Sequence, residues 1–123
     1  LKGASAPYIQ YAYARLKSVL RKSKTLPAKF DPAALKEKEE AELLRHLVHF
    51  AETVEASASR YEPNRLADYL LKLAEKINSL YEKVSILNAE NKLKIARLML
   101  ITAAALVLKN GMNLLGIEMP ERM

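Results

Sequence analysis

The sequence predicts an all-α protein, an antiparallel bundle of four to five main helices. Apolar residues recur at three- and four-residue steps along most of the chain, and no segment shows sustained period-two alternation. Three glycines and five prolines in 123 residues are too few for many short strands joined by tight turns. This length fits one domain, so we expect residues 1–123 to form a single domain.

Composition narrows the classes of protein further. Half of the residues are hydrophobic and 28% are charged, which argues against a disordered chain. Without cysteine there are no disulfides or thiolate metal sites, and a cytoplasmic location is compatible with this. The longest apolar run, Leu98–Leu108, is too short for a membrane span of about 20 residues and predicts a buried helix. Because the chain opens on Leu1 with no signal core, we expect it to be a piece of a longer protein.

The first expected helix begins with Ser5 as its cap and has Pro7 in its first turn. This helix is expected to end near Lys24, and a loop over residues 25–30 follows. Its apolar stripe consists of Ile9, Ala12, Leu16, Val19 and Leu20.

The second expected helix begins at Asp31-Pro32, an N-cap followed by proline at the first helical position, and runs to about Phe50. Residues 51–60 form either a third helix or a continuation of the second, and the pattern leaves both open. The acidic residues of the second helix are interpreted as a solvated face: Glu37, Glu39, Glu40 and Glu42.

A long helix restarts at Glu62-Pro63 and carries a stripe of apolar residues to Val84. Asn88 is the expected cap of the last helix, and Gly111 its left-handed exit. The expected core face of that helix consists of Leu93, Ala96, Leu100, Ala103, Ala104, Val107 and Leu108.

Signatures of catalysis are missing from the sequence. His46 and His49 lie three residues apart, but no HExxH pattern or cysteine supports a zinc site, so they are interpreted as surface or partly buried helix residues. There is no glycine-rich phosphate-binding loop and no GxSxG elbow. We therefore expect no catalytic residue, metal site or cofactor in this chain.

The charge of the chain is +6 and unevenly distributed. Residues 1–30 hold seven basic side chains and no acidic one, which suggests RNA, DNA or an anionic membrane surface as partner. An exposed helix that is merely rich in lysine and arginine would give the same charge. A membrane-surface helix needs a free apolar face, and the bundle core uses the apolar stripe here, so we expect no membrane partner.

The first helix combines aromatic and basic side chains. Tyr11, Arg15, Ser18 and Lys22 share one helical face, and further polar residues lie on adjoining faces: Gln10, Lys17, Arg21 and Lys24. Aromatic rings and guanidinium planes stack on unpaired bases while cations neutralise phosphates, so this face suits single-stranded nucleic acid. Alternatively, Tyr8, Tyr11 and Tyr13 simply pack against the bundle.

Four stretches of the sequence form an ordered set of motifs. They are Ile9-Gln10-Tyr11-Ala12-Tyr13-Ala14-Arg15, Leu43-Leu44-Arg45-His46-Leu47, residues 61–70 with Ile77-Asn78-Ser79-Leu80-Tyr81, and residues 107–117 with the closing Pro120-Glu121-Arg122-Met123. In this order they resemble the C-terminal anticodon-binding (DALR-type) domain of arginyl-tRNA synthetases, and the resemblance covers essentially the whole chain.

The resemblance implies a module that grips the anticodon loop of tRNA(Arg). A catalytic domain of the same parent chain, a class I arginine–tRNA ligase, would use ATP with magnesium to join arginine to the tRNA. This chain has neither that class's HIGH-like element nor its KMSKS-like loop.

The resemblance also suggests which residues contact the RNA. Arg15 would donate to a base edge or phosphate, and its alternative is an ion pair with Glu82 or Glu121. The remaining candidates are Tyr81, Met123, Gln10, Tyr11 and Asn78 as contacts, and Lys17, Arg21 and Lys22 as neighbours of phosphates. The competing hypothesis is a helical protein-interaction bundle whose basic helix docks an acidic partner.

Overall fold

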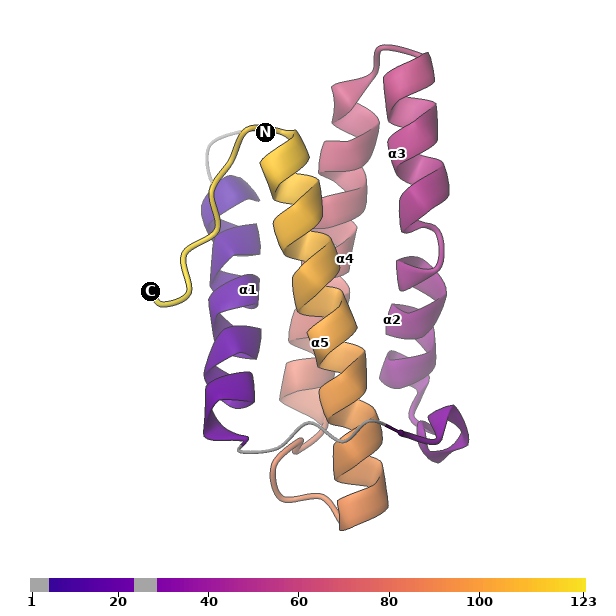
Figure 1. Ribbon diagram of the computed structural model, residues 1–123, viewed down its shortest axis with the longest axis vertical. Coiled ribbons are helices and arrows are strands. Elements are labelled where there is room, and N and C mark those ends of the chain that lie inside the picture. The colour runs from indigo at the N-terminus through magenta and orange to yellow at the C-terminus, as the bar shows by residue number, and fades with distance from the viewer. Residues whose placement is uncertain (1–4, 24–28) are drawn as a thin grey trace.

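The computed structural model describes residues 5–23 and 29–123, and this part of the chain is helical, without strands (Figure 1). The predicted all-α fold is therefore confirmed. The predicted helix end near Lys24 and most of the loop at 25–30 lie outside the described residues. The elements are α1 (Ser5–Lys22), a 3₁₀ turn η1 (Pro32–Ala34), α2 (Lys38–Leu47), α3 (Phe50–Ser59), α4 (Pro63–Lys83) and α5 (Asn91–Leu114).

Helix α4 is the centre of the bundle, because it packs against α1, α2, α3 and α5. Helix α1 lies on one side of α4 and α5, and α2 and α3 follow one another along the other side (Figure 1). The apolar stripes of the helices pack together in one core. Its largest fully buried side chains include Ile9, Leu16, Leu43, Leu70, Leu73, Ile77, Ile101 and Leu108.

Helix α5 is a core helix. By length and composition it could cross a membrane, but 56% of its most apolar window is buried inside the bundle, against α1, α2 and α4. The expected core face is largely confirmed, except that Ala103 is exposed.

Gly111 does not end α5, so its predicted role as a left-handed exit is wrong. The helix continues to Leu114, and Gly116, with φ of +79°, takes the left-handed conformation. Gly111 is buried instead against α4, where a Cβ atom would lie 2.6 Å from Cδ2 of Leu70. The glycine therefore permits a close helix–helix approach.

The second helix begins later than the sequence predicts. The Asp31 carboxylate accepts from the Ala33 N–H as predicted for a cap, but it starts only the 3₁₀ turn. Helix α2 begins at Lys38 through a capping box formed by Glu37 and Glu40. A turn at Val48–His49 then separates α2 from α3, which settles the alternative that the sequence left open.

The cap of α5 is Glu90, and the prediction of Asn88 is wrong. The Glu90 carboxylate accepts from the backbone N–H groups of Lys92 and Leu93. A carboxylate is also favourable at the positive end of the helix dipole. Asn88 stays two residues upstream, exposed on the segment that joins α4 to α5.

Glu40 is fully buried, which corrects its assignment to a solvated face. Its carboxylate accepts a 2.7 Å hydrogen bond from Nε of the buried Arg97, and Arg97 also donates to the Ser85 carbonyl at 3.0 Å. A charge can be buried when it is paired and hydrogen-bonded. This pair ties α2, α5 and the α4–α5 segment together.

His46 is a partly buried helix residue as predicted, but His49 lies in the turn between α2 and α3 and not on a helix. His49 is exposed, and the half-buried His46 ring stacks on Tyr69 with centroids 4.1 Å apart. The Tyr69 hydroxyl donates to the His46 carbonyl at 2.6 Å, and His46 Nε2 lies 3.0 Å from the Tyr69 carbonyl oxygen. His46 therefore joins α2 to α4.

Candidate nucleic-acid interface

The guanidinium of Arg15 lies between two tyrosine rings. Its Cζ atom is 4.7 Å from the ring centroid of Tyr11, on the same helix, and 4.4 Å from that of Tyr81, on α4. Both distances are within the range of a cation–π interaction. Both tyrosines are partly exposed, Tyr11 by 49% and Tyr81 by 39%, so the cluster is open to solvent.

Asn78 fixes the orientation of the arginine. Arg15 Nη1 donates a 3.0 Å hydrogen bond to Oδ1 of Asn78, one turn before Tyr81 on α4. Among the described residues, no other acceptor bonds to Arg15, so the alternative ion pair with Glu82 or Glu121 is not formed. Since a guanidinium has five N–H donors, most of them remain available to a ligand.

The sequence places these four residues, hereafter the Arg15 cluster, through two helical spacings. Tyr11 and Arg15 are four residues apart on α1, and Asn78 and Tyr81 are three apart on α4, so each pair shares a helical face. Buried neighbours on each helix, Ile9 and Leu16 on α1 and Ile77 and Leu80 on α4, hold the two faces side by side.

The C-terminal tail, residues 115–123, turns back at Gly116 and runs along α1 (Figure 1). Gln10 Nε2 donates to the Glu118 carbonyl at 2.9 Å, and Arg21 Nη1 donates to the Glu121 carbonyl at 3.0 Å. Lys17 Nζ lies 3.7 Å from the Glu121 carboxylate. Three predicted RNA contacts therefore hold the tail.

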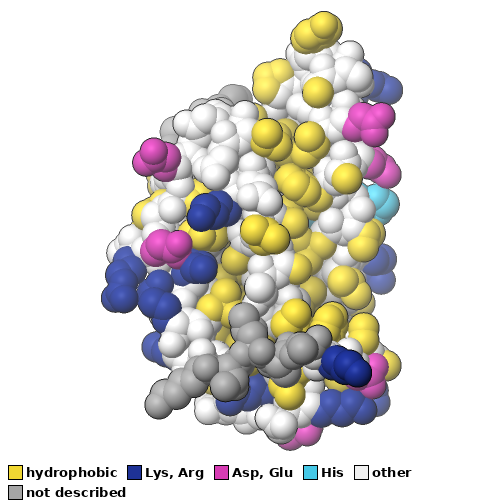
Figure 2. Space-filling model, in the orientation of Figure 1, with side chains coloured by type: hydrophobic (Ala, Val, Ile, Leu, Met, Phe, Trp, Pro, Cys, Tyr) yellow, Lys and Arg dark blue, Asp and Glu magenta, His cyan; other side chains and the backbone are white. Residues whose placement is uncertain are grey.

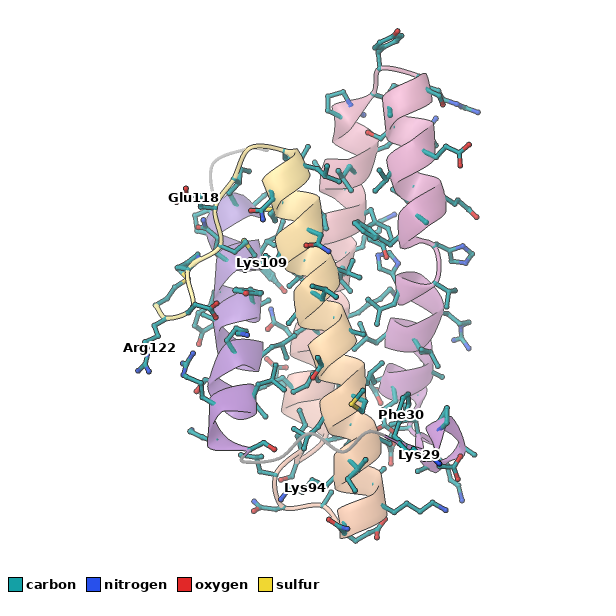
Figure 3. The ribbon with its side chains drawn as sticks, in the orientation of Figure 1. Lys29, Phe30, Lys94, Lys109, Glu118 and Arg122 are labelled. Carbon is teal, nitrogen blue, oxygen red and sulfur yellow. The ribbon has the colours of Figure 1, made fainter. Side chains whose placement is uncertain are left out.

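Positive charge gathers around α1 and the tail. Lysine and arginine side chains gather on that side of the molecule, with acidic side chains among them (Figure 2), and Arg122 projects from the tail there (Figure 3). Lys22 is exposed at the carboxyl end of α1, and Met123 is 68% exposed at the end of the tail. Although Glu118 and Glu121 lie on the tail, basic side chains are in the majority, so the surface beside the Arg15 cluster has a net positive charge.

Tyr13 belongs to the core, as the alternative interpretation of the α1 tyrosines allowed. It is 2% exposed, and burial raises the pKa of its hydroxyl, with a smaller contribution from the Glu121 carboxylate. Tyr11, in contrast, faces solvent beside Arg15.

Eight of the nine predicted site residues thus fall into two groups. Tyr11, Arg15, Asn78 and Tyr81 meet in one cluster, and Gln10, Lys17 and Arg21 contact the tail that ends in Met123. Among the described residues, Lys22 forms no hydrogen bond or ion pair with either group, but it lines a cavity that Tyr81 also borders. The Ser85 side of that cavity lies on an irregular segment, which carries no periodic signal that would predict it.

Comparison with known proteins decides the family. The family model described as DALR anticodon binding domain matches residues 9–123. The chain belongs to the DALR anticodon binding domain family. Its matched region contains the whole Arg15 cluster and the tail.

Family relatives agree with this assignment. The arginine–tRNA ligase of Streptococcus uberis is 38% identical over 99% of this chain, and that of Clostridium botulinum strain Langeland is 40% identical over 98%. This chain spans 22% of the length of each of those relatives.

Solved structures share the fold. The arginyl-tRNA synthetase of Thermus thermophilus matches with a TM-score of 0.89 at 35% identity, over 99% of this chain and 22% of that one. A structure from Campylobacter jejuni, at 22% identity, matches with a TM-score of 0.80 over 94% of this chain and agrees in fold alone.

Proposed function

We propose that this chain, as a single domain over residues 1–123, binds the anticodon loop of tRNA(Arg) for an arginine–tRNA ligase. The observation that carries the proposal is the half-buried Arg15, held between two partly exposed tyrosines with most of its donors free. An unpaired base can stack on such rings while the guanidinium donates to its edge or to a phosphate. The membership of the chain in the DALR anticodon binding domain family supports the same proposal.

The proposed mechanism is recognition, not catalysis. Contacts of lysine and arginine with phosphates fix the register of the RNA, and contacts with base edges read its sequence. Arg15, Tyr11, Tyr81 and Asn78 would read one base, and the basic surface of α1 with the tail and Met123 would position the loop. A catalytic domain of the parent protein would carry out the ATP- and magnesium-dependent aminoacylation in the cytoplasm.

A binding titration tests this function. A stem-loop with an arginine anticodon and a twin with a changed middle base are titrated with the chain at two salt concentrations. We expect tighter binding of the cognate loop at both salts, because base contacts discriminate by about 1–3 kcal/mol and are less salt-dependent than phosphate contacts. Equal binding that fades with salt for both loops contradicts the proposal and favours a basic docking helix for an acidic partner.

A matched pair of variants locates the interaction. Arg15→Ala should lose most of the discrimination between the two loops. Arg45→Ala removes an exposed arginine from α2 and should retain it. The result that contradicts the Arg15 assignment is discrimination that survives in Arg15→Ala while circular dichroism shows an intact fold.

A further inference from the structure

A cavity of about 290 Å³ lies next to the Arg15 cluster, between the end of α1 and the segment that joins α4 to α5. Its volume is just below the range for ligand pockets, roughly 300–1,000 Å³, and is large enough for part of a nucleotide. Tyr81 borders it, so one side chain belongs both to the Arg15 cluster and to the cavity. Other lining residues include Ser18, Lys22, Val84, Ser85 and Asn88.

We infer that this cavity is a second nucleotide subsite, which takes the unpaired nucleotide next to the one bound at Arg15 and Tyr81. The inference rests on the proposed function and adds a site to it. It concerns the α4–α5 segment, to which the sequence pattern assigned no role in binding.

The chemistry of the walls suits a nucleotide. Val19, Val84 and Leu87 give the cavity apolar walls for the face of a base, and Tyr81 adds an aromatic border. The Asn88 side chain can both donate and accept, which matches the mixed edge of a base.

The charge of the cavity suits a phosphate. Among the described residues that line it, Lys22 is the only charged one, and no carboxylate faces the space. Lys22 forms no ion pair with another described residue, so its ammonium group is available. Arg21 also lies in the last turn of α1, and Lys83 ends α4.

The far wall of the cavity is held in place from inside the bundle. Arg97 donates to the Ser85 carbonyl at 3.0 Å, and the buried Glu40 carboxylate holds Arg97 at 2.7 Å. The Val84 N–H also donates to the Leu80 carbonyl at 3.0 Å as α4 ends. A wall fixed by buried groups loses little conformational entropy when a ligand binds.

The test removes bases from the RNA one at a time. A stem-loop with an arginine anticodon is made in versions that each lack one loop base but keep every phosphate. Wild-type chain should lose about tenfold in affinity at two adjacent loop positions, as expected when a stacked base is removed. Arg15→Ala should abolish the sensitivity at one of these positions only.

In Ser85→Trp, the indole replaces an exposed side chain that lines the cavity and should fill the cavity. The backbone carbonyl of residue 85 can still accept the hydrogen bond from Arg97. The variant should weaken binding of the intact loop about tenfold and abolish the sensitivity at the other position. Ala58→Trp adds the same side chain to an exposed site on α3 and should behave as wild type. Asn88→Ala should keep the sensitivity to base removal but reduce the preference among the four bases at that position.

The outcomes separate the subsite from the proposed function. If Ser85→Trp binds every RNA as Ala58→Trp does while the Arg15-dependent position remains, the subsite is overturned and the proposed function stands. If no loop position matters to the wild-type chain and Arg15→Ala changes nothing, the proposed function fails, and the subsite fails with it.

Discussion

Arg15 and Tyr81 are 66 positions apart in the sequence, yet the guanidinium of one lies 4.4 Å from the ring centroid of the other. The contact joins α1 to α4 at a place where both side chains are partly open to solvent. A cation–π pair of this kind keeps the arginine extended over the ring before any ligand arrives. The geometry is therefore preorganised for a planar, electron-rich partner such as a base.

Replacement of Tyr81 tests the role of its ring. Tyr81→Leu should weaken binding of the cognate stem-loop by about 1–3 kcal/mol, because a base stacked on an aromatic ring contributes that much. Tyr81→Phe keeps the ring and should retain most of the affinity. Tyr61→Leu, at a site that is 92% exposed beyond α3, serves as the control in the same fluorescence titration. Equal affinities for Tyr81→Leu and wild type would refute stacking.

The charge of Lys22 should act through phosphates and without regard to sequence. Lys22→Gln is expected to weaken cognate and non-cognate loops by the same factor. It should also lower the slope of log affinity against log salt by about 0.7, the value for one phosphate contact on a single strand. Lys72→Gln, an exposed lysine elsewhere on α4, should leave that slope unchanged. A change in base preference in Lys22→Gln would contradict a purely electrostatic role.

Removal of only one partner of the buried Glu40–Arg97 ion pair should lower the stability of the fold. Glu40→Leu leaves the arginine charge buried without its partner, so the free energy of unfolding should fall by about 3–5 kcal/mol. The double variant Glu40→Leu with Arg97→Met removes both charges and should recover much of that loss in urea unfolding. If the double variant is less stable than Glu40→Leu alone, the pair is not the source of the effect.

Gly111→Ala tests the close approach of α5 and α4. Alanine favours a helix over glycine by up to about 1 kcal/mol, but its Cβ atom would lie 2.6 Å from Leu70 Cδ2. Since Leu70 is fully buried, we expect a net destabilisation of about 1–3 kcal/mol. Leu70→Val should relieve part of this, so the double variant should cost less than the sum of the singles. Strict additivity would show that the two residues do not clash.

His46 should make stability depend on pH. Burial, together with the charges of Lys76, Lys72 and His49, holds the pKa of His46 below its usual 6.5 in the folded chain, although a hydrogen bond with the Tyr69 carbonyl opposes this. As the pH falls below about 6.5, His46 therefore becomes protonated in the unfolded chain before it does in the folded chain. The free energy of unfolding should then decrease with falling pH until the pH is below the pKa of His46 in the folded chain.

The measurement is urea unfolding at pH 7.5, 6.5 and 5.5, for wild type and for His46→Phe. The phenylalanine keeps an aromatic ring against Tyr69 but cannot titrate. Wild type should lose more stability between pH 6.5 and 5.5 than the variant does. Parallel pH profiles for the two proteins would show that His46 is not the group responsible.

The local sequence determined most of the helices. It also determined which residues of the Arg15 cluster are neighbours on the same helix. The apolar stripes of residues 9–20 and 66–84 specify which faces are buried, because a helix repeats every 3.6 residues. The same spacing places Tyr11 beside Arg15 and Asn78 beside Tyr81. The start of α4 at Glu62-Pro63 is also predicted by the local sequence, because proline is accommodated in the first turn of a helix.

Only the tertiary structure decided which of these faces meet and which charges are buried. Whether Arg15 pairs with a carboxylate or stacks on Tyr81, and whether Glu40 faces water or Arg97, depends on partners more than 50 residues away. The role of Gly111 is likewise set by a distant residue, Leu70 on α4. The wrong prediction of Asn88 as a cap has a local cause instead, because Glu90 two residues later caps the helix. Periodicity reports which side of a helix is apolar, but pairing energies between distant groups arise only when the helices have packed.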